Sequence, residues 1–118
     1  MPNFCDELKL KMHEYVKNAY HLARKFPTEE LYGVTSQLRR SALSVILNFI
    51  EGYARFKPGD KLRFWEISYA SLKESKYLLY FSMTEDYLTK EEYKQILTNA
   101  EEVGKMLWRV MSPLREGK

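Results

Sequence analysis

A stripe of charged and amide side chains is the part of this sequence best suited to chemistry. Arg40, Ser44, Asn48, Glu51 and Arg55 follow one another at steps of four, four, three and four residues. On a helix, this spacing places all five on one side. Beside them runs an apolar stripe of Leu38, Val45, Phe49, Gly52 and Phe56. A guanidinium, an amide and a carboxylate held together are groups that a polar binding site or a catalytic site could use.

The next helix along the chain offers partners for this stripe. A turn at Pro58-Gly59 makes an antiparallel hairpin. Its register brings Arg40 near Glu74, Ser44 near Ser71 and Asn48 near Ser68. One interpretation is a functional site on the inner face of the two helices. We favour the other interpretation, a structural network that fixes their register, because buried ion pairs often serve specificity rather than stability.

A second candidate site lies where these two helices meet, because cations alternate there with aromatic rings. Cations can contact phosphates while rings stack on bases, so this corner is a candidate nucleic-acid surface. The alternative is a solvated surface with no ligand, in which Phe64 points into the core, and it is the commoner explanation of a small basic cluster. The cations are Arg55, Lys57, Lys61 and Arg63, and the rings are Tyr53, Phe56, Phe64 and Trp65.

The sequence gives little support to metal, cofactor or nucleophile chemistry. His13 and His21 are eight residues apart, which is too far for the i, i+4 pair of a zinc helix. Cys5 has no neighbouring base, and the Glu-x-x-His repeat of di-iron bundles is absent. We therefore expect no catalytic residues, no metal and no cofactor, and we do not expect an enzyme.

Composition sets the size and setting of the protein. The 118 residues suffice for one domain spanning 1–118, and a 45% hydrophobic content can fill its core without disulfides. The net charge of +3 is lower than that of strongly basic nucleic-acid-binding domains. A single cysteine, with no signal peptide and no membrane-spanning run, indicates a cytoplasmic protein without a membrane partner.

Four amphipathic segments predict an all-α fold. Apolar periodicity and capping residues place helices at about 6–26, from Thr35 or Ser36 to Phe56, from a cap at Asp60 to Thr84, and after a capping box at Thr89. Short connections make neighbouring helices antiparallel, so we expect an up-down-up-down four-helix bundle.

The aromatic content predicts a second buried surface. Aromatic residues make up 14% of the chain, more than a bundle this small buries easily. The segment 77–81, Tyr-Leu-Leu-Tyr-Phe, is apolar on nearly every side, and such a helix is normally buried all round. A homo-oligomer or a partner protein would supply the missing cover.

A set of residues spread over nearly the whole chain matches the pattern of a known family. It comprises Phe26-Pro27, Glu30, Tyr32-Gly33, Ser36-Gln37-Leu38-Arg39-Arg40, Ser41-Ala42, Ser44-Val45, Asn48, Glu51-Gly52-Tyr53-Ala54-Arg55, Phe64 and Ser71-Leu72-Lys73-Glu74. In these residues the sequence resembles the four-helix bundle proteins encoded in intervening sequences of bacterial 23S ribosomal RNA genes. Ile46-Leu47 departs from the pattern, because relatives often carry Pro and a small residue there; we expect a straighter second helix.

The resemblance implies a ring-shaped homopentamer of bundles with no established activity. It also implies similarity to the accessory protein of diversity-generating retroelements, which partners a reverse transcriptase and nucleic acid. We therefore expect a non-catalytic assembly protein with RNA or DNA as a possible ligand. The alternative is a scaffold that binds a partner protein and makes no contact with nucleic acid.

Overall fold

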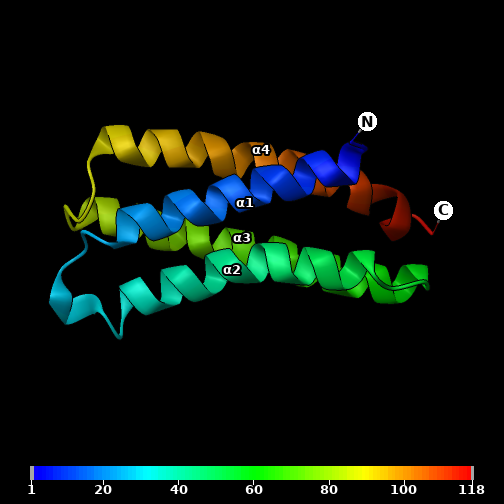
Figure 1. Cartoon of the computed structure of the whole chain (residues 1–118), viewed down its shortest axis with the longest axis horizontal. Helices are drawn as coiled ribbons and strands as arrows, with labels where there is room; N and C mark the ends of the chain where they lie inside the picture. Colours follow the sequence, from blue (N-terminus) through cyan, green and yellow to red (C-terminus); the bar gives the residue numbers. More distant parts are fainter. Residues whose placement is uncertain (1, 118) are drawn as a thin grey trace.

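A computed structural model describes residues 2–117, and every regular element within them is helical (Figure 1). Four α-helices pack against one another in a molecule with extents of 45 × 26 × 24 Å. A short 3₁₀ helix, η1, lies in the first connection. The elements are α1 (Phe4–Ala23), η1 (Thr28–Glu30), α2 (Val34–Tyr53), α3 (Pro58–Thr84) and α4 (Lys90–Arg115).

Helices α2 and α3 run in opposite directions, as their hydrogen bonds show. Ser71 lies against Ser44, Ser68 against Val45, and Trp65 against Phe49. Numbers therefore rise along one helix as they fall along the other. Figure 1 shows the first connection at the left end of the molecule and the α2–α3 turn at the right end.

The apolar stripe of α2 forms part of the core, as its periodicity predicts. Leu38, Val45 and Phe49 are almost fully buried, and α1 and α4 contribute Leu8, Met12 and Leu107. A buried hydrogen bond of 2.7 Å joins the Tyr15 and Ser75 hydroxyls within this core. Burial raises the pKa of Tyr15 well above its ordinary value, so this phenol stays protonated.

The start of α2 differs from the sequence-based expectation. Its N-cap is Gly33, and neither Thr35 nor Ser36 caps it. The Glu30 carboxylate instead accepts a hydrogen bond from the Val34 N–H at 3.3 Å. The Glu30 side chain, from η1, therefore accepts the hydrogen bond that an N-cap side chain would accept. The residue types at the start of α2 alone do not predict this.

Two further helix boundaries follow from local chemistry. The expected cap at Asp60 is wrong, because α3 begins at Pro58, whose fixed φ suits the first turn of a helix. The capping box at Thr89 is confirmed: its hydroxyl accepts from the Glu92 N–H and the Glu92 carboxylate accepts from the Thr89 N–H.

The segment 77–81 is not buried all round in this chain. Leu78 and Leu79 are buried, but Tyr77 is 62% exposed and Tyr80 is 48% exposed. The second surface expected over these rings is thus left open in the single chain. Within residues 2–117, no helix has the length and apolar character needed to cross a membrane.

Candidate functional site

The middle of the polar stripe forms a compact hydrogen-bonded seam between α2 and α3. The hydroxyls of Ser44 and Ser71 share a hydrogen bond of 2.7 Å. The Asn48 amide donates to the carbonyl oxygen and the hydroxyl of Ser44, at 3.0 and 2.9 Å. These three side chains provide one another's hydrogen-bond partners, so we interpret the seam as structural packing between the two helices.

The two ends of the stripe are exposed, which corrects the expectation of an inner charged face. Arg40 and Glu74 do pair, with Nη2 and Oε2 2.8 Å apart, but their side chains are 64% and 43% exposed. Glu51 and Arg55 form an i, i+4 pair on the same helix, also at 2.8 Å and also exposed. The stripe therefore holds serines and an amide between the helices and ion pairs on the surface.

Close packing of α2 on α3 depends on small side chains. The buried Ser68 hydroxyl donates to the Val45 carbonyl oxygen at 2.6 Å, rather than lying against Asn48 as expected. A serine in this position lets the helix backbones approach. The residues of the alternative interpretation, a functional site at Arg40, Asn48, Glu51 and Glu74, are thus divided between two surface pairs and the seam.

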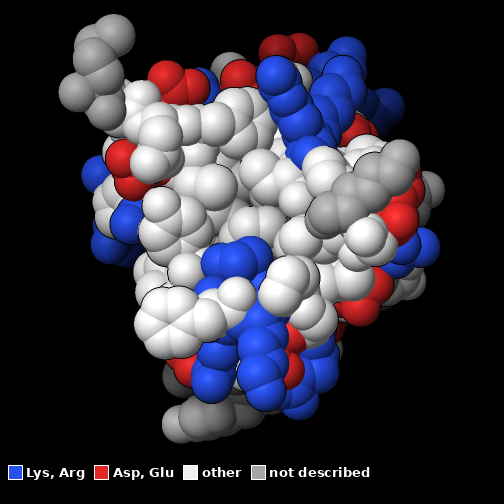
Figure 2. All heavy atoms as spheres, turned by 90° about the vertical axis from the view of Figure 1, so that its right-hand side faces the viewer, with Lys and Arg blue, Asp and Glu red and all other residues white. Residues whose placement is uncertain are grey.

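The four cations of the corner lie at the end of the molecule where α2 joins α3. We call Arg55, Lys57, Lys61 and Arg63 the basic corner. Figure 2 looks onto this end and shows Lys and Arg side chains gathered in its lower part beside uncharged side chains. Phe56, between the two helices, is fully exposed, so the apolar stripe of α2 ends before it.

The corner's cations differ in how they are held. The guanidinium carbons of Arg55 and Arg63 lie 4.7 and 5.0 Å from the centroid of the Phe64 ring. Phe64 is thus half-buried beneath cations rather than in the core, where it was expected. The Lys61 ammonium donates to the carbonyls of Gly52 and Tyr53 at 3.2 Å each, so it closes the end of α2.

Sequence reasoning missed the packing that supports this corner. Trp65 is 4% exposed, stacks on Phe49 with ring centroids 5.2 Å apart, and donates its N–H to the Phe49 carbonyl at 3.0 Å. A Cβ on Gly52 would lie 2.6 Å from Trp65 Cδ1, so only glycine leaves room for the indole. A glycine inside the predicted apolar stripe was the available signal.

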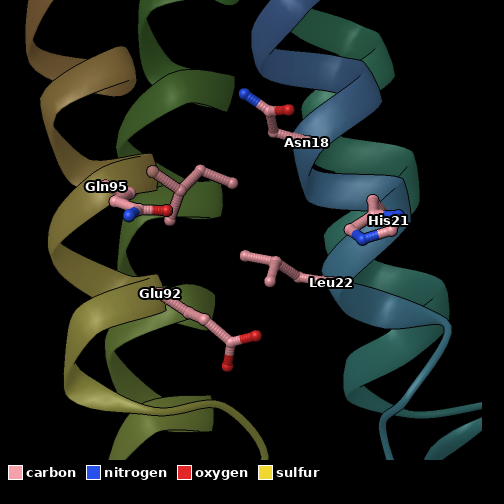
Figure 3. A pocket seen from close by; sticks show the side chains of 6 residues that line it. Asn18, His21, Leu22, Glu92 and Gln95 are labelled. Atoms are coloured by element: carbon pink, nitrogen blue, oxygen red, sulfur yellow. The ribbon is translucent and has the colours of Figure 1, made fainter.

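Two surface grooves lie away from the seam. One, of about 270 Å³, lies between α1 and α4, where Leu22, Glu92 and Gln95 point into the space between the helices (Figure 3). Glu92 is already engaged by Lys25, and this hydrogen bond, with that of Thr89, lowers the pKa of the carboxyl. The other groove, of about 380 Å³, lies between α3 and α4 beside Trp108.

The residues described by the structure contain no group of three or more His, Cys, Asp or Glu side chains able to hold a metal ion. Burial raises the pKa of the Cys5 thiol, which disfavours the reactive thiolate.

The helix arrangement defines a class, the all-α proteins built of four packed helices. The chain belongs to the 23S rRNA-intervening sequence protein family, whose model matches residues 7–109. This membership confirms the resemblance deduced from the sequence. None of the curated proteins matches the chain.

A solved structure shares this fold. It is the crystal structure of a protein of unknown function from the S23 ribosomal protein family of Bacteroides thetaiotaomicron VPI-5482. The two superpose with a TM-score of 0.82 over 88% of this chain and 97% of the other, at 23% sequence identity. At this identity the similarity establishes the fold, and function has to come from the surfaces described above.

Proposed function

We propose that the protein is a non-catalytic, homo-oligomeric assembly that binds nucleic acid through the basic corner. In this proposal, the single domain is an antiparallel up-down-up-down bundle, and about five copies form a ring in the cytoplasm. The observation that carries the proposal is the gathering of four cations and the exposed Phe56 ring at one end of the molecule. Repetition around a ring would turn this modest cluster into a continuous basic rim.

Exposed apolar side chains on α2 and α3 support self-assembly. Leu47 is 57% exposed, and Ile50 and Ile67 are each 43% exposed. The register set by Ser44 with Ser71 and by Val45 with Ser68 places Leu47 level with Ile67. We call Leu47, Ile50 and Ile67 the apolar strip, and we propose that a second copy covers it.

The chemistry of the corner supports a phosphate-bearing ligand. Lys57 is exposed, and neither Lys57 nor Arg63 has an ion-pair partner among residues 2–117; Arg63 lies over the Phe64 ring. Arg55 forms an ion pair with Glu51, and Lys61 donates hydrogen bonds to carbonyl groups at the end of α2. Lys57 and Arg63 are therefore the leading phosphate contacts, with Arg55 next and Lys61 in a supporting role.

Fluorescence anisotropy tests the binding directly. Labelled structured RNA, single-stranded DNA and duplex DNA are titrated at two salt concentrations, with the double variant Lys57→Glu/Arg63→Glu beside the unaltered chain. We expect binding that weakens steeply with salt, because counterions are released from the phosphates, and that is lost in the variant. Lys17→Glu/Lys94→Glu, which changes exposed lysines of α1 and α4, is the matched control.

Two results would contradict the proposal. One is that no nucleic acid binds at low salt, and the other is that the two double variants bind equally well. The second candidate function, a scaffold for a partner protein, would then take over. The apolar strip favours that candidate, since exposed apolar patches bind proteins and a partner could cover the strip in place of a second copy.

A further inference from the structure

The two unpartnered buried polar atoms of the described chain belong to residues that line the same pocket. Thr35 Oγ1 and Arg39 Nε are both buried, and neither has a hydrogen-bond partner among residues 2–117. The two residues sit one turn apart at the start of α2, and Thr35 is only 3% exposed. Buried polar groups are nearly always paired, so two orphans on residues that line one pocket point to a missing occupant.

The pocket itself is larger than one water molecule and is positively charged. It has a volume of about 160 Å³, several times the ~30 Å³ that a water occupies in the liquid. Its charged lining residues are Arg24 and Arg39, and no acidic residue lines it. Two guanidinium groups without a carboxylate between them favour an anion over water.

The location adds a third favourable element. Thr35 is the second residue of α2, so the pocket lies near the positive end of a 20-residue helix. The first N–H of this helix, that of Val34, is taken by Glu30, and the following N–H groups in the first turn lack intrahelical partners. The Arg39 guanidinium is held 5.4 Å from the Tyr20 ring centroid, which limits its freedom before any ligand arrives. Arginine, a helix N-terminus and a hydroxyl donor together are typical of phosphate binding.

We infer that this pocket, lined by Arg24, Thr35 and Arg39, binds a phosphate group. Thr35 donates its hydroxyl, Arg39 donates through Nε, and Arg24 adds charge from the end of α1. The phosphate comes either from a small phosphorylated molecule or from the terminal phosphate of a nucleic acid. The pocket is at the opposite end of α2 from the basic corner, so the inference does not rest on the function proposed above.

Thermal unfolding with inorganic phosphate tests this site. A ligand that binds the folded state alone raises the melting temperature as its concentration rises. We expect phosphate to raise it more than chloride does at equal ionic strength. Thr35→Val, which keeps the side-chain shape, and Arg39→Gln should each weaken phosphate binding about tenfold or more, because each removes a hydrogen bond to a charged group.

Matched variants separate binding from folding. Arg109 also lies over a ring, that of Phe4 at 4.9 Å, but it does not line the pocket, so Arg109→Gln should keep the full phosphate effect. Thr35→Ser keeps the hydroxyl and should also keep the full effect of phosphate on the melting temperature. This variant still tests the hydroxyl if Thr35→Val folds poorly. Lys57→Glu/Arg63→Glu at the basic corner should leave the effect unchanged, so the two proposals can fail separately.

The source of the phosphate follows from a second titration. Equal binding of inorganic phosphate, AMP and a 5′-phosphorylated oligonucleotide indicates a small phosphorylated ligand. Tighter binding of that oligonucleotide than of its 5′-hydroxyl twin and of AMP indicates a nucleic-acid end. The inference is overturned if phosphate has no effect beyond ionic strength, or if Arg39→Gln and Arg109→Gln respond alike. The inference is also overturned if Thr35→Val stabilises the protein and phosphate stabilises neither this variant nor the unaltered chain, because the pocket would then hold only water.

Discussion

Gly52 is the position at which one added methyl group should do the most damage. Gly52→Ala places a Cβ 2.6 Å from Trp65 Cδ1, 2.7 Å from its Nε1 and 3.0 Å from the Lys61 carbonyl oxygen. Two of these atoms belong to a rigid indole that is stacked on Phe49, and the third is backbone. No flexible side-chain end is available to move aside, so the indole has to shift.

The magnitude follows from opposing contributions. Overpacking of this kind costs about 1–3 kcal/mol. A shifted indole also loses its 3.0 Å hydrogen bond to the Phe49 carbonyl, which leaves a buried donor unpaired at about 1–3 kcal/mol. Alanine recovers up to about 1 kcal/mol of helix propensity over glycine. We expect a net loss of about 1–6 kcal/mol in the free energy of unfolding.

Urea denaturation followed by circular dichroism measures this loss, and Gly104→Ala is its matched control. Gly104 is also inside a helix, but a Cβ there meets only Leu72 Cδ2, at 3.4 Å. That substitution should be neutral or should stabilise the protein by up to about 1 kcal/mol. Equal effects of the two substitutions, or a stable Gly52→Ala variant, would refute the packing argument at Trp65.

Three further predictions concern ion pairs and pH. Because Arg40 and Glu74 are exposed, Arg40→Ala and Glu74→Ala should each cost at most about 1 kcal/mol in a urea double-mutant cycle, and losses of 3 kcal/mol or more would show that the pair is buried in an assembly. Tyr87 donates a hydrogen bond to Glu30 at 2.8 Å, and this bond is the main cause that raises the pKa of Tyr87 to about 12. The stabilisation that the bond gives is therefore complete below pH 10 and is lost as the pH rises toward 12. Tyr87→Phe should flatten the fall of the urea midpoint at alkaline pH, and an unchanged profile would contradict this. The hydrogen bond from Lys25 lowers the pKa of Glu92, so this carboxylate stabilises the fold above the ordinary value of 4.5 and loses that effect in acid. The urea midpoint of Glu92→Gln should therefore fall less steeply below pH 4.5 than that of the unaltered chain. Equal slopes in acid would count against this.

Periodicity and capping predicted the helices and the Arg40–Glu74 contact, because both depend on residues close in sequence or on simple register. The sequence could not show that Arg40 and Glu51 lie outside, since exposure depends on where α2 packs on α3. The end of α2 at Tyr53 was missed for a similar reason. Lys61 closes that end from the next helix, and Pro58 starts α3 early.

The prediction that Phe64 points into the core was wrong, because the adjacent Trp65 occupies the core instead. Trp65 has a glycine-lined space and a carbonyl to receive its N–H, and both come from α2. Neither is visible along α3 alone. The phosphate pocket was missed in the same way, since Arg24 comes from the end of α1 and the two orphaned groups come from α2.

Self-association is the central claim, and the molar mass in solution tests it most directly. Multi-angle light scattering on the purified chain at micromolar concentration should report about five times the 14.1 kDa chain mass. Leu47→Glu, in the apolar strip, should lower that mass, whereas Leu10→Glu on α1, at a similarly exposed leucine, should not. A mass of 14.1 kDa for the unaltered chain at every concentration would contradict the account.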